Sequence, residues 1–152
     1  MRVESRRTTT VPPQVVFDHL AIPEAWSVWA RFPGAKLARP GTGEKYGVGS
    51  IRRIWPVQEE TVAYERPEHY GYRMLSGGPA KDYRADVHLE VGPDGGTALR
   101  WEAGFEARLP GTGPVVRLFF DKMIAYLATG LTRHVEHCTA SCPAYKRSDN
   151  AA

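Results

Sequence analysis

Apolar residues near the C-terminal end of the chain recur with the spacing of an α-helix. Over residues 114–138 they fall on one stripe when successive residues are placed about 100° apart. The stripe consists of Val116, Phe119, Phe120, Met123, Ile124, Tyr126, Leu127 and Leu131. The opposite side carries Arg117, Asp121, Lys122, Thr129, Thr132 and Glu136. The pattern predicts one long amphipathic helix whose apolar face must be buried.

Before this helix, apolar and polar residues alternate in the manner of β-strands. The clearest alternation covers residues 83–91, and a Gly-Pro-Asp-Gly-Gly turn at 92–96 separates it from a second strand that ends near Phe105. Further strands are expected at residues 2–11, 35–39, 49–57, 59–65 and 69–75. The connections are short, which favours antiparallel pairing because parallel strands need long crossovers.

Two short helices are expected between the first two strands. One begins after Pro12-Pro13, and the other covers residues 23–30 and places Trp26 and Trp29 on one face. Only the sheet can receive the apolar face of the long helix, because the chain has no second long helix. We therefore expect an α+β fold: a curved antiparallel sheet of about seven strands around the long C-terminal helix. Two short helices would close one end, and a cavity would remain inside.

Length and composition indicate one globular domain. The chain has 152 residues, of which 42% are hydrophobic and 24% are charged, as in ordinary globular domains with a core. We expect this domain to cover residues 1–142. The polar residues 143–152 are expected to form a disordered tail.

Charge and hydropathy limit the partners that we expect. The net charge is +3, but basic residues are scattered among acidic ones, so nucleic-acid binding is not expected. No apolar run is long enough to span a membrane, and no apolar segment follows the charged residues 1–7, so neither a membrane span nor a secretory signal is expected. A cytoplasmic location is the default. An exposed edge strand could pair with the same strand of a second copy. The oligomeric state is therefore left open between a monomer and a homodimer.

The only two cysteines, Cys138 and Cys142, lie four residues apart near His134 and His137. On a helix this spacing places the thiols on neighbouring turns, where disulfide geometry is poor. The run could be read as a metal cluster, but no second ligand pair occurs elsewhere and Cys138 continues the apolar stripe. We therefore expect no metal and no cofactor.

The order of these elements resembles the helix-grip fold of the START, Bet v 1 and polyketide cyclase/dehydrase superfamily. The resemblance covers residues 3–138. It rests on the sequences at 11–17, 47–52, 65–72 and 95–101, and on the two tryptophans of the second short helix. The superfamily contains ligand carriers as well as enzymes. The resemblance therefore implies a cavity for a small hydrophobic molecule, but it does not fix the chemistry.

Candidate catalytic residues lie on the third strand, where alternation puts Ser50, Arg52 and Ile54 on one face. The sequence does not show which face looks inward. Aromatase/cyclase members place a Ser-x-Arg pair on a cavity-lining strand, and similarity to them implies that Ser50 and Arg52 face the cavity. There a guanidinium could stabilise an enolate and a hydroxyl could relay a proton. The alternative is that Arg52 pairs with Glu59 or Glu60 on the adjacent strand.

Aromatic and aliphatic side chains are expected to line the cavity, with tyrosine hydroxyls as polar anchors. The expected ligand-binding residues are Trp26, Trp29, Ile54, Tyr64, Tyr70, Tyr72, Tyr83, Trp101, Phe105, Phe120, Met123 and Leu127. A purely structural role is the alternative for each of them, and it is favoured for Trp101 and for any single one of the tyrosines. We predict a protein that binds an aromatic, polyketide-like or lipid-like molecule. It would act as a cyclase or dehydratase, or as a carrier or sensor without turnover.

Overall fold

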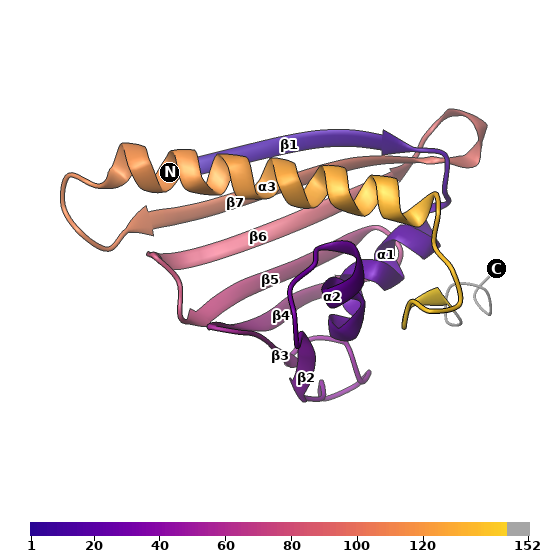
Figure 1. Ribbon diagram of the computed structural model, residues 1–152, viewed down its shortest axis with the longest axis horizontal. Helices are drawn as coiled ribbons and strands as arrows, with labels where there is room; N and C mark the ends of the chain where they lie inside the picture. The colour runs from indigo at the N-terminus through magenta and orange to yellow at the C-terminus, as the bar shows by residue number, and fades with distance from the viewer. Residues whose placement is uncertain (146–152) are drawn as a thin grey trace.

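The computed structural model describes residues 1–145 and shows an antiparallel sheet curved around one long helix (Figure 1). Seven strands form the sheet in the order β1-β7-β6-β5-β4-β3-β2. Their bounds are β1 Arg2–Thr9, β2 Lys36–Arg39, β3 Ile51–Ile54, β4 Val57–Glu65, β5 His69–Ser76, β6 Ala80–Val91 and β7 Thr97–Ala107. Strands β2 to β7 follow one another as a meander, and β1 lies beside β7. The predicted α+β architecture is confirmed.

Helix α3 (Gly113–Val135) is the long C-terminal helix and lies along β1 and β7 (Figure 1). Pro114 stands in its first turn, where a missing backbone N–H has no cost. The helix buries Phe120, Ile124 and Leu131 against the sheet. Arg7 of β1 ties the two elements together, because its Nε donates to Thr129 Oγ1 at 3.1 Å.

Two short helices, α1 (Pro13–Ala21) and α2 (Trp26–Trp29), are joined by a 3-10 turn at Pro23–Ala25. The indoles of α2 hold them together: Trp26 Nε1 donates to the Leu20 carbonyl at 2.9 Å, and Trp29 Nε1 donates to the His19 carbonyl at 3.0 Å. A buried indole N–H needs such a partner. The two helices therefore form one unit at the end of the sheet.

Cross-strand pairs of apolar residues build the concave wall on β6 and β7. Val87 lies opposite Trp101, and Leu89 lies opposite Leu99. All four side chains are buried. The alternation predicted from the sequence therefore identifies the inner face of these two strands correctly.

The observed burial of α3 differs from the predicted stripe at three positions. Phe119 and Tyr126 are 47% and 49% exposed, whereas Thr132, which was placed on the polar side, is buried. The Thr132 hydroxyl donates to the Ala128 carbonyl at 2.9 Å, which satisfies it inside the core. The Tyr126 hydroxyl reaches the Ala30 carbonyl at 3.0 Å, so this ring lies across the surface.

The single strand predicted at residues 49–57 is wrong in its extent. The strand β3 covers only Ile51–Ile54, and the chain turns at Trp55 and Pro56 into β4. Trp55 lies in this turn and is 82% exposed. A proline cannot donate to the strand ladder, which accounts for the break.

Helix α3 ends at Val135, so the two cysteines follow the helix instead of continuing it. Cys142 and Ala144 are buried, and the described chain therefore stays in contact with the domain as far as residue 144. Residues 146–152 of the expected tail lie outside the described residues. Within residues 1–145, no helix combines the length and the apolar character that crossing a membrane requires.

Candidate functional site

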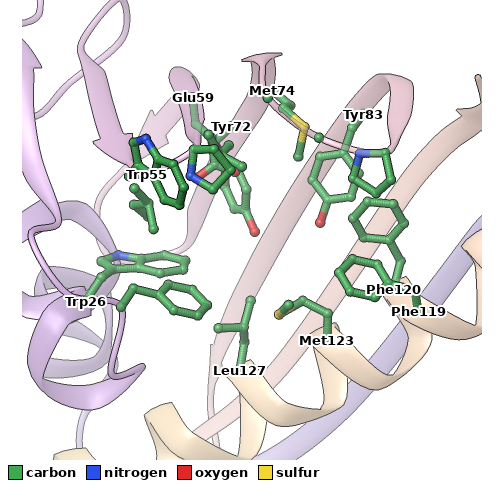
Figure 2. Close-up of a pocket in the computed structure, with 17 residues that line it drawn as sticks. Trp26, Trp55, Glu59, Tyr72, Met74, Tyr83, Phe119, Phe120, Met123 and Leu127 are labelled. Atoms are coloured by element: carbon green, nitrogen blue, oxygen red, sulfur yellow. The ribbon is translucent and has the colours of Figure 1, made fainter.

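A pocket of about 350 Å³ lies between the concave face of the sheet and α3 (Figure 2). Its lining residues are Trp26, Phe32, Ile54, Trp55, Pro56, Val57, Glu59, Tyr72, Met74, Gly77, Gly78, Pro79, Tyr83, Phe119, Phe120, Met123 and Leu127. Most of these side chains are apolar, and many are aromatic. The exposed Trp55 and half-exposed Phe119 belong to the lining, so the pocket opens to solvent there.

The structure brings many of the predicted ligand-binding residues together around this pocket. Those that line it are Trp26, Ile54, Tyr72, Tyr83, Phe120, Met123 and Leu127. They come from α2, from strands β3, β5 and β6, and from α3. Residues distant in the sequence thus converge on one hollow, because the sheet curves over the helix.

The other predicted residues, Trp29, Tyr64, Tyr70, Trp101 and Phe105, are not part of the lining. Trp101 packs behind the lining: it is fully buried, with its ring centre 6.0 Å from that of Trp26. Tyr64 is only partly buried, and its ring lies against that of Phe17. Phe105 lies against the rings of the lining residues Tyr83 and Phe120. Alternation identifies the inner face of a strand, but it does not show how far along the strand the cavity extends.

Sequence reasoning missed the part of the lining that comes from turns. Phe32, the turn residues Trp55 and Pro56, and the segment 77–79 lie between regular elements and carry no periodic signal. Met74 is different, because it continues the alternation of Tyr70 and Tyr72 along β5 and could have been identified from it. Glu59 entered only as a partner of Arg52, although it also lines the pocket.

One turn of the rim is fixed by a glycine. Gly77 has φ of +91°, and a Cβ at this position would collide with the backbone carbonyl of Pro56. Only glycine adopts this conformation at low cost and allows so close an approach. The turn between β3 and β4 and the turn between β5 and β6 are therefore in direct backbone contact at the pocket.

A buried ion pair lies at the inner end of the pocket. Arg52 and Glu59 are directly opposite on β3 and β4, and Arg52 Nε donates to Glu59 Oε1 at 3.0 Å. The guanidinium carbon lies 3.9 Å from the Trp26 ring centre and 4.5 Å from that of Tyr72, and Nη1 donates to the Leu20 carbonyl. Of the two arrangements considered from the sequence, the structure shows the pairing with Glu59; Arg52 is buried but is not part of the pocket lining.

The two predicted catalytic residues lie behind the lining. The Ser50 hydroxyl donates to Thr61 Oγ1 at 3.0 Å, and Thr61 Oγ1 lies 3.1 Å from the Tyr70 hydroxyl. Tyr70 in turn accepts from Arg52 Nη1 at 3.3 Å. Ser50 and Arg52 thus belong to one buried polar network, and their catalytic roles stay predictions.

Burial controls the protonation of the polar groups at this pocket. Burial raises the pKa of Glu59 above its ordinary value, and the adjacent guanidinium of Arg52 opposes part of this rise. Burial alone would lower the pKa of Arg52, but the neighbouring Tyr70 and Glu59 outweigh it, so the arginine stays charged. Counted over residues 1–145, Glu59 is the only charged side chain in the lining.

The hydroxyls of two phenols face the pocket and interact with each other. Figure 2 shows the hydroxyls of Tyr72 and Tyr83 pointing into the space bounded by Trp26, Met123 and Leu127. Burial raises the pKa of both phenols, so both remain protonated at neutral pH. An apolar hollow with a few fixed donors is typical of a ligand site.

A family described as "Polyketide cyclase / dehydrase and lipid transport" matches residues 1–139. No curated protein matches the chain. Solved structures with the same fold are numerous. A START superfamily protein from Mycobacterium smegmatis is 18% identical, with a TM-score of 0.74 over 91% of this chain and 99% of that chain.

Two further structures show the same likeness. A protein from Nitrosospira multiformis is 20% identical, with a TM-score of 0.67 over 93% of this chain and 98% of that chain. Norcoclaurine synthase from Thalictrum flavum, solved with dopamine and hydroxybenzaldehyde, is 16% identical, with a TM-score of 0.66 over 92% of this chain and 88% of that chain. At such identities the likeness concerns the fold alone, which is the helix-grip fold.

Proposed function

Because the chain belongs to the polyketide cyclase / dehydrase and lipid transport family, we propose that it binds a small aromatic molecule in the pocket beside α3. The observation that carries this proposal is the pocket itself, an apolar hollow into which the hydroxyls of Tyr72 and Tyr83 point (Figure 2). Family and fold support hydrophobic ligand binding in general. The wall of rings favours a flat, aromatic guest over a flexible chain.

The volume of the pocket suggests the size of the guest. An apolar cavity of about 150 Å³ accommodates one benzene ring. The pocket here, at about 350 Å³, would accept about two rings on the same scale. The norcoclaurine synthase structure holds dopamine and hydroxybenzaldehyde, and these aromatic molecules support the same chemical class for this chain.

Filling the pocket from the helix should weaken binding. We expect the wild-type protein to bind 2-naphthol, a two-ring phenol, and Met123→Trp to weaken the affinity at least about tenfold, because the larger ring occupies the site. Titration followed by tryptophan fluorescence, together with isothermal calorimetry, measures the change. Arg117→Trp is the matched control, because Arg117 is exposed on the same helix and lies outside the lining. Equal loss in both variants, or no binding by the wild type, would contradict the proposal.

A second candidate function, ring closure or dehydration of a poly-ketone, is favoured by Glu59. A buried carboxylate with a raised pKa is a stronger base than a free one. Glu59 would remove a proton from the carbon beside a ketone, while Tyr72 or Tyr83 donates a hydrogen bond to the enolate oxygen. The enolate carbon would attack a second carbonyl, and the proton would return to the new alkoxide. Loss of a second α-proton and of the hydroxyl group as water would complete a dehydration.

In this candidate function Arg52 acts through Glu59, as an electrostatic anchor that holds the carboxylate at the pocket. Its Nη2 is buried and has no hydrogen-bond partner within residues 1–145. A ligand oxygen that reached this nitrogen would accept a hydrogen bond from it and satisfy it. Ser50 braces Tyr70 through Thr61 and thereby helps to orient the guanidinium. We propose positioning roles for both residues.

Proton abstraction can be tested without knowledge of the natural substrate. We expect the protein to accelerate exchange of the α-protons of 2-tetralone, a two-ring ketone, with D₂O, as followed by proton NMR. Glu59→Gln should lower this acceleration by about 10²-fold or more, since general-base catalysis contributes that much. Glu60→Gln is the control, because Glu60 lies on the opposite face of β4 and pairs with Arg73. If 2-tetralone binds but exchanges at the buffer rate, the carrier or sensor function is retained and the enzymatic one is rejected.

A further inference from the structure

A cluster of four metal-ligand side chains lies at the C-terminal end of α3. The cluster consists of His19, His134, Cys138 and Cys142, and one ligand atom from each lies within 4.8 Å of the others. Two imidazoles and two thiols are the donor set of Cys₂His₂ zinc sites. We propose that this cluster binds Zn²⁺. None of the four residues lines the pocket, so the inference goes beyond the proposed function.

Three separate segments supply these ligands. His19 comes from α1, His134 from the last turn of α3, and the cysteines from the segment that follows α3. The sequence offered His137 as the second histidine, but His137 is exposed and is not part of the cluster. The expectation that no metal site is present depended on the lack of a second ligand pair elsewhere in the sequence and on Cys138 continuing the apolar stripe. Because α1 packs against α3, His19 supplies a ligand from elsewhere in the sequence.

The hydrogen bonds of His19 prepare it to bind a metal. Its Nδ1 lies 2.8 Å from the Val15 carbonyl, which can only accept, so Nδ1 carries the proton. The other nitrogen, Nε2, therefore presents its lone pair, and it lies 3.2 Å from Cys138 Sγ. In zinc sites the metal-binding histidine usually donates its second N–H to a carbonyl or carboxylate in this way.

The distances within the cluster suit a tetrahedral ion after a small contraction. Zinc bonds of about 2.0–2.3 Å separate neighbouring ligand atoms by roughly 3.3–3.8 Å. The separation of His19 Nε2 and Cys138 Sγ is close to this range, and the widest separation in the cluster is within 4.8 Å. Both cysteines are free thiols, so neither is lost to a disulfide.

An unpartnered atom independently points to a ligand at this position. His134 Nε2 is buried and has no hydrogen-bond partner within the described part of the chain. Its ring centre lies 5.1 Å from that of His19. A buried polar atom without a partner is destabilising. Coordination of a metal ion would satisfy this nitrogen.

Four protein ligands would complete the coordination of Zn²⁺ and leave no open position for water or substrate. Such a closed site is structural. Its effect would be to fasten the segment after α3, including the buried Ala144, onto α1. Zinc would therefore stabilise the end of the domain without taking part in chemistry at the pocket.

The test uses Co²⁺, whose spectrum reports its ligands. Chelator-treated full-length protein is titrated with Co²⁺ and then with Zn²⁺. We expect intense visible bands of tetrahedral Co²⁺ and thiolate charge-transfer absorption, which saturate near about one ion per chain and disappear when Zn²⁺ displaces the cobalt. The melting temperature should rise with Zn²⁺ and fall again with chelator.

Variants distinguish this cluster from adventitious binding. Cys138→Ser and Cys142→Ser should each remove about half of the thiolate absorption, and the double variant all of it. His19→Ala should lower the affinity for Co²⁺ at least about tenfold. His137→Ala should behave as the wild type. The proposal is overturned if wild-type protein gives only the weak spectrum of octahedral Co²⁺, if the double cysteine variant keeps the tetrahedral bands, or if mass spectrometry finds a Cys138–Cys142 disulfide in reductant-free protein that takes up no metal.

Discussion

Replacing Arg52 with alanine should lower the free energy of unfolding by about 3–5 kcal/mol. The substitution leaves the carboxylate of Glu59 buried without its cation, and it also removes the guanidinium that lies against Trp26 and Tyr72. Both side chains of the pair are almost fully buried, so water cannot replace the lost partner. Urea unfolding followed by circular dichroism measures the loss.

A double variant tests whether the loss of stability comes from the buried Glu59 carboxylate that is left without a cation. Arg52→Met combined with Glu59→Leu should regain most of the stability, because a buried pair can often be replaced by apolar side chains of similar volume. Arg73→Ala is the matched control: Arg73 pairs with Glu60 on the neighbouring position of β4, but its side chain is 56% exposed. An exposed pair contributes about 0–1 kcal/mol. If Arg52→Ala and Arg73→Ala had equal effects, the buried pair would not have the importance assigned to it.

Replacing Trp101 with alanine should cost about 3–5 kcal/mol of stability. Trp101 is fully buried, and its ring lies against those of Trp26, Trp29 and Tyr72. The cavity left by the indole would remove the support behind the pocket wall, so the affinity for 2-naphthol should fall as well. Thermal and urea unfolding measure the first effect, and fluorescence titration measures the second.

Trp55→Ala is the contrasting tryptophan variant. Trp55 is 82% exposed and lines the pocket. Its loss should change the stability by no more than about 0.5 kcal/mol, while the affinity for 2-naphthol falls. Comparable destabilisation by both variants would show that the assigned depths of the two rings are wrong.

The inner face of the sheet could be predicted because apolar and polar residues alternate along each strand. On β6 and β7, apolar residues such as Val87 and Trp101 occupy every second position and are covered by α3 or by the short helices. The long helix was predicted for the same reason, through its period of 3.6 residues. The prediction from this period is wrong for Phe119 and Thr132, which lie at the borders of the stripe. There, local contacts decide burial.

The pocket could be predicted only in part. Tyr72 and Tyr83 follow from alternation, but Trp55 and the segment 77–79 belong to turns, and the curvature of the sheet determines where turns lie in space. Glu59 shows the same limit: its charge suggested a partner for Arg52, whereas its place in the lining depends on the position of the strand end. How far along a strand the pocket extends depends on how the whole chain folds, and alternation within one strand does not show it.

The metal cluster shows how far local spacing can be trusted. Cys138 and Cys142 were read together with His134 and His137 because these residues are close in the sequence, and His134 does belong to the cluster. The second histidine of the cluster is His19, which comes from the other end of the sequence. Only the packing of α1 on α3 brings the two parts together, and no spacing rule within one segment could reveal it.

The backbone contact between Gly77 and Pro56 limits how molecules of different size can be admitted. Two turns that touch through main-chain atoms cannot separate by rotating side chains, so this edge of the opening has a constant width. The opposite edge is formed by Phe119 and Met123, whose side chains can change rotamer. A bulky guest should therefore pass on the helical edge, and changes of ligand size between homologous proteins should appear at those two positions before they appear in the turns.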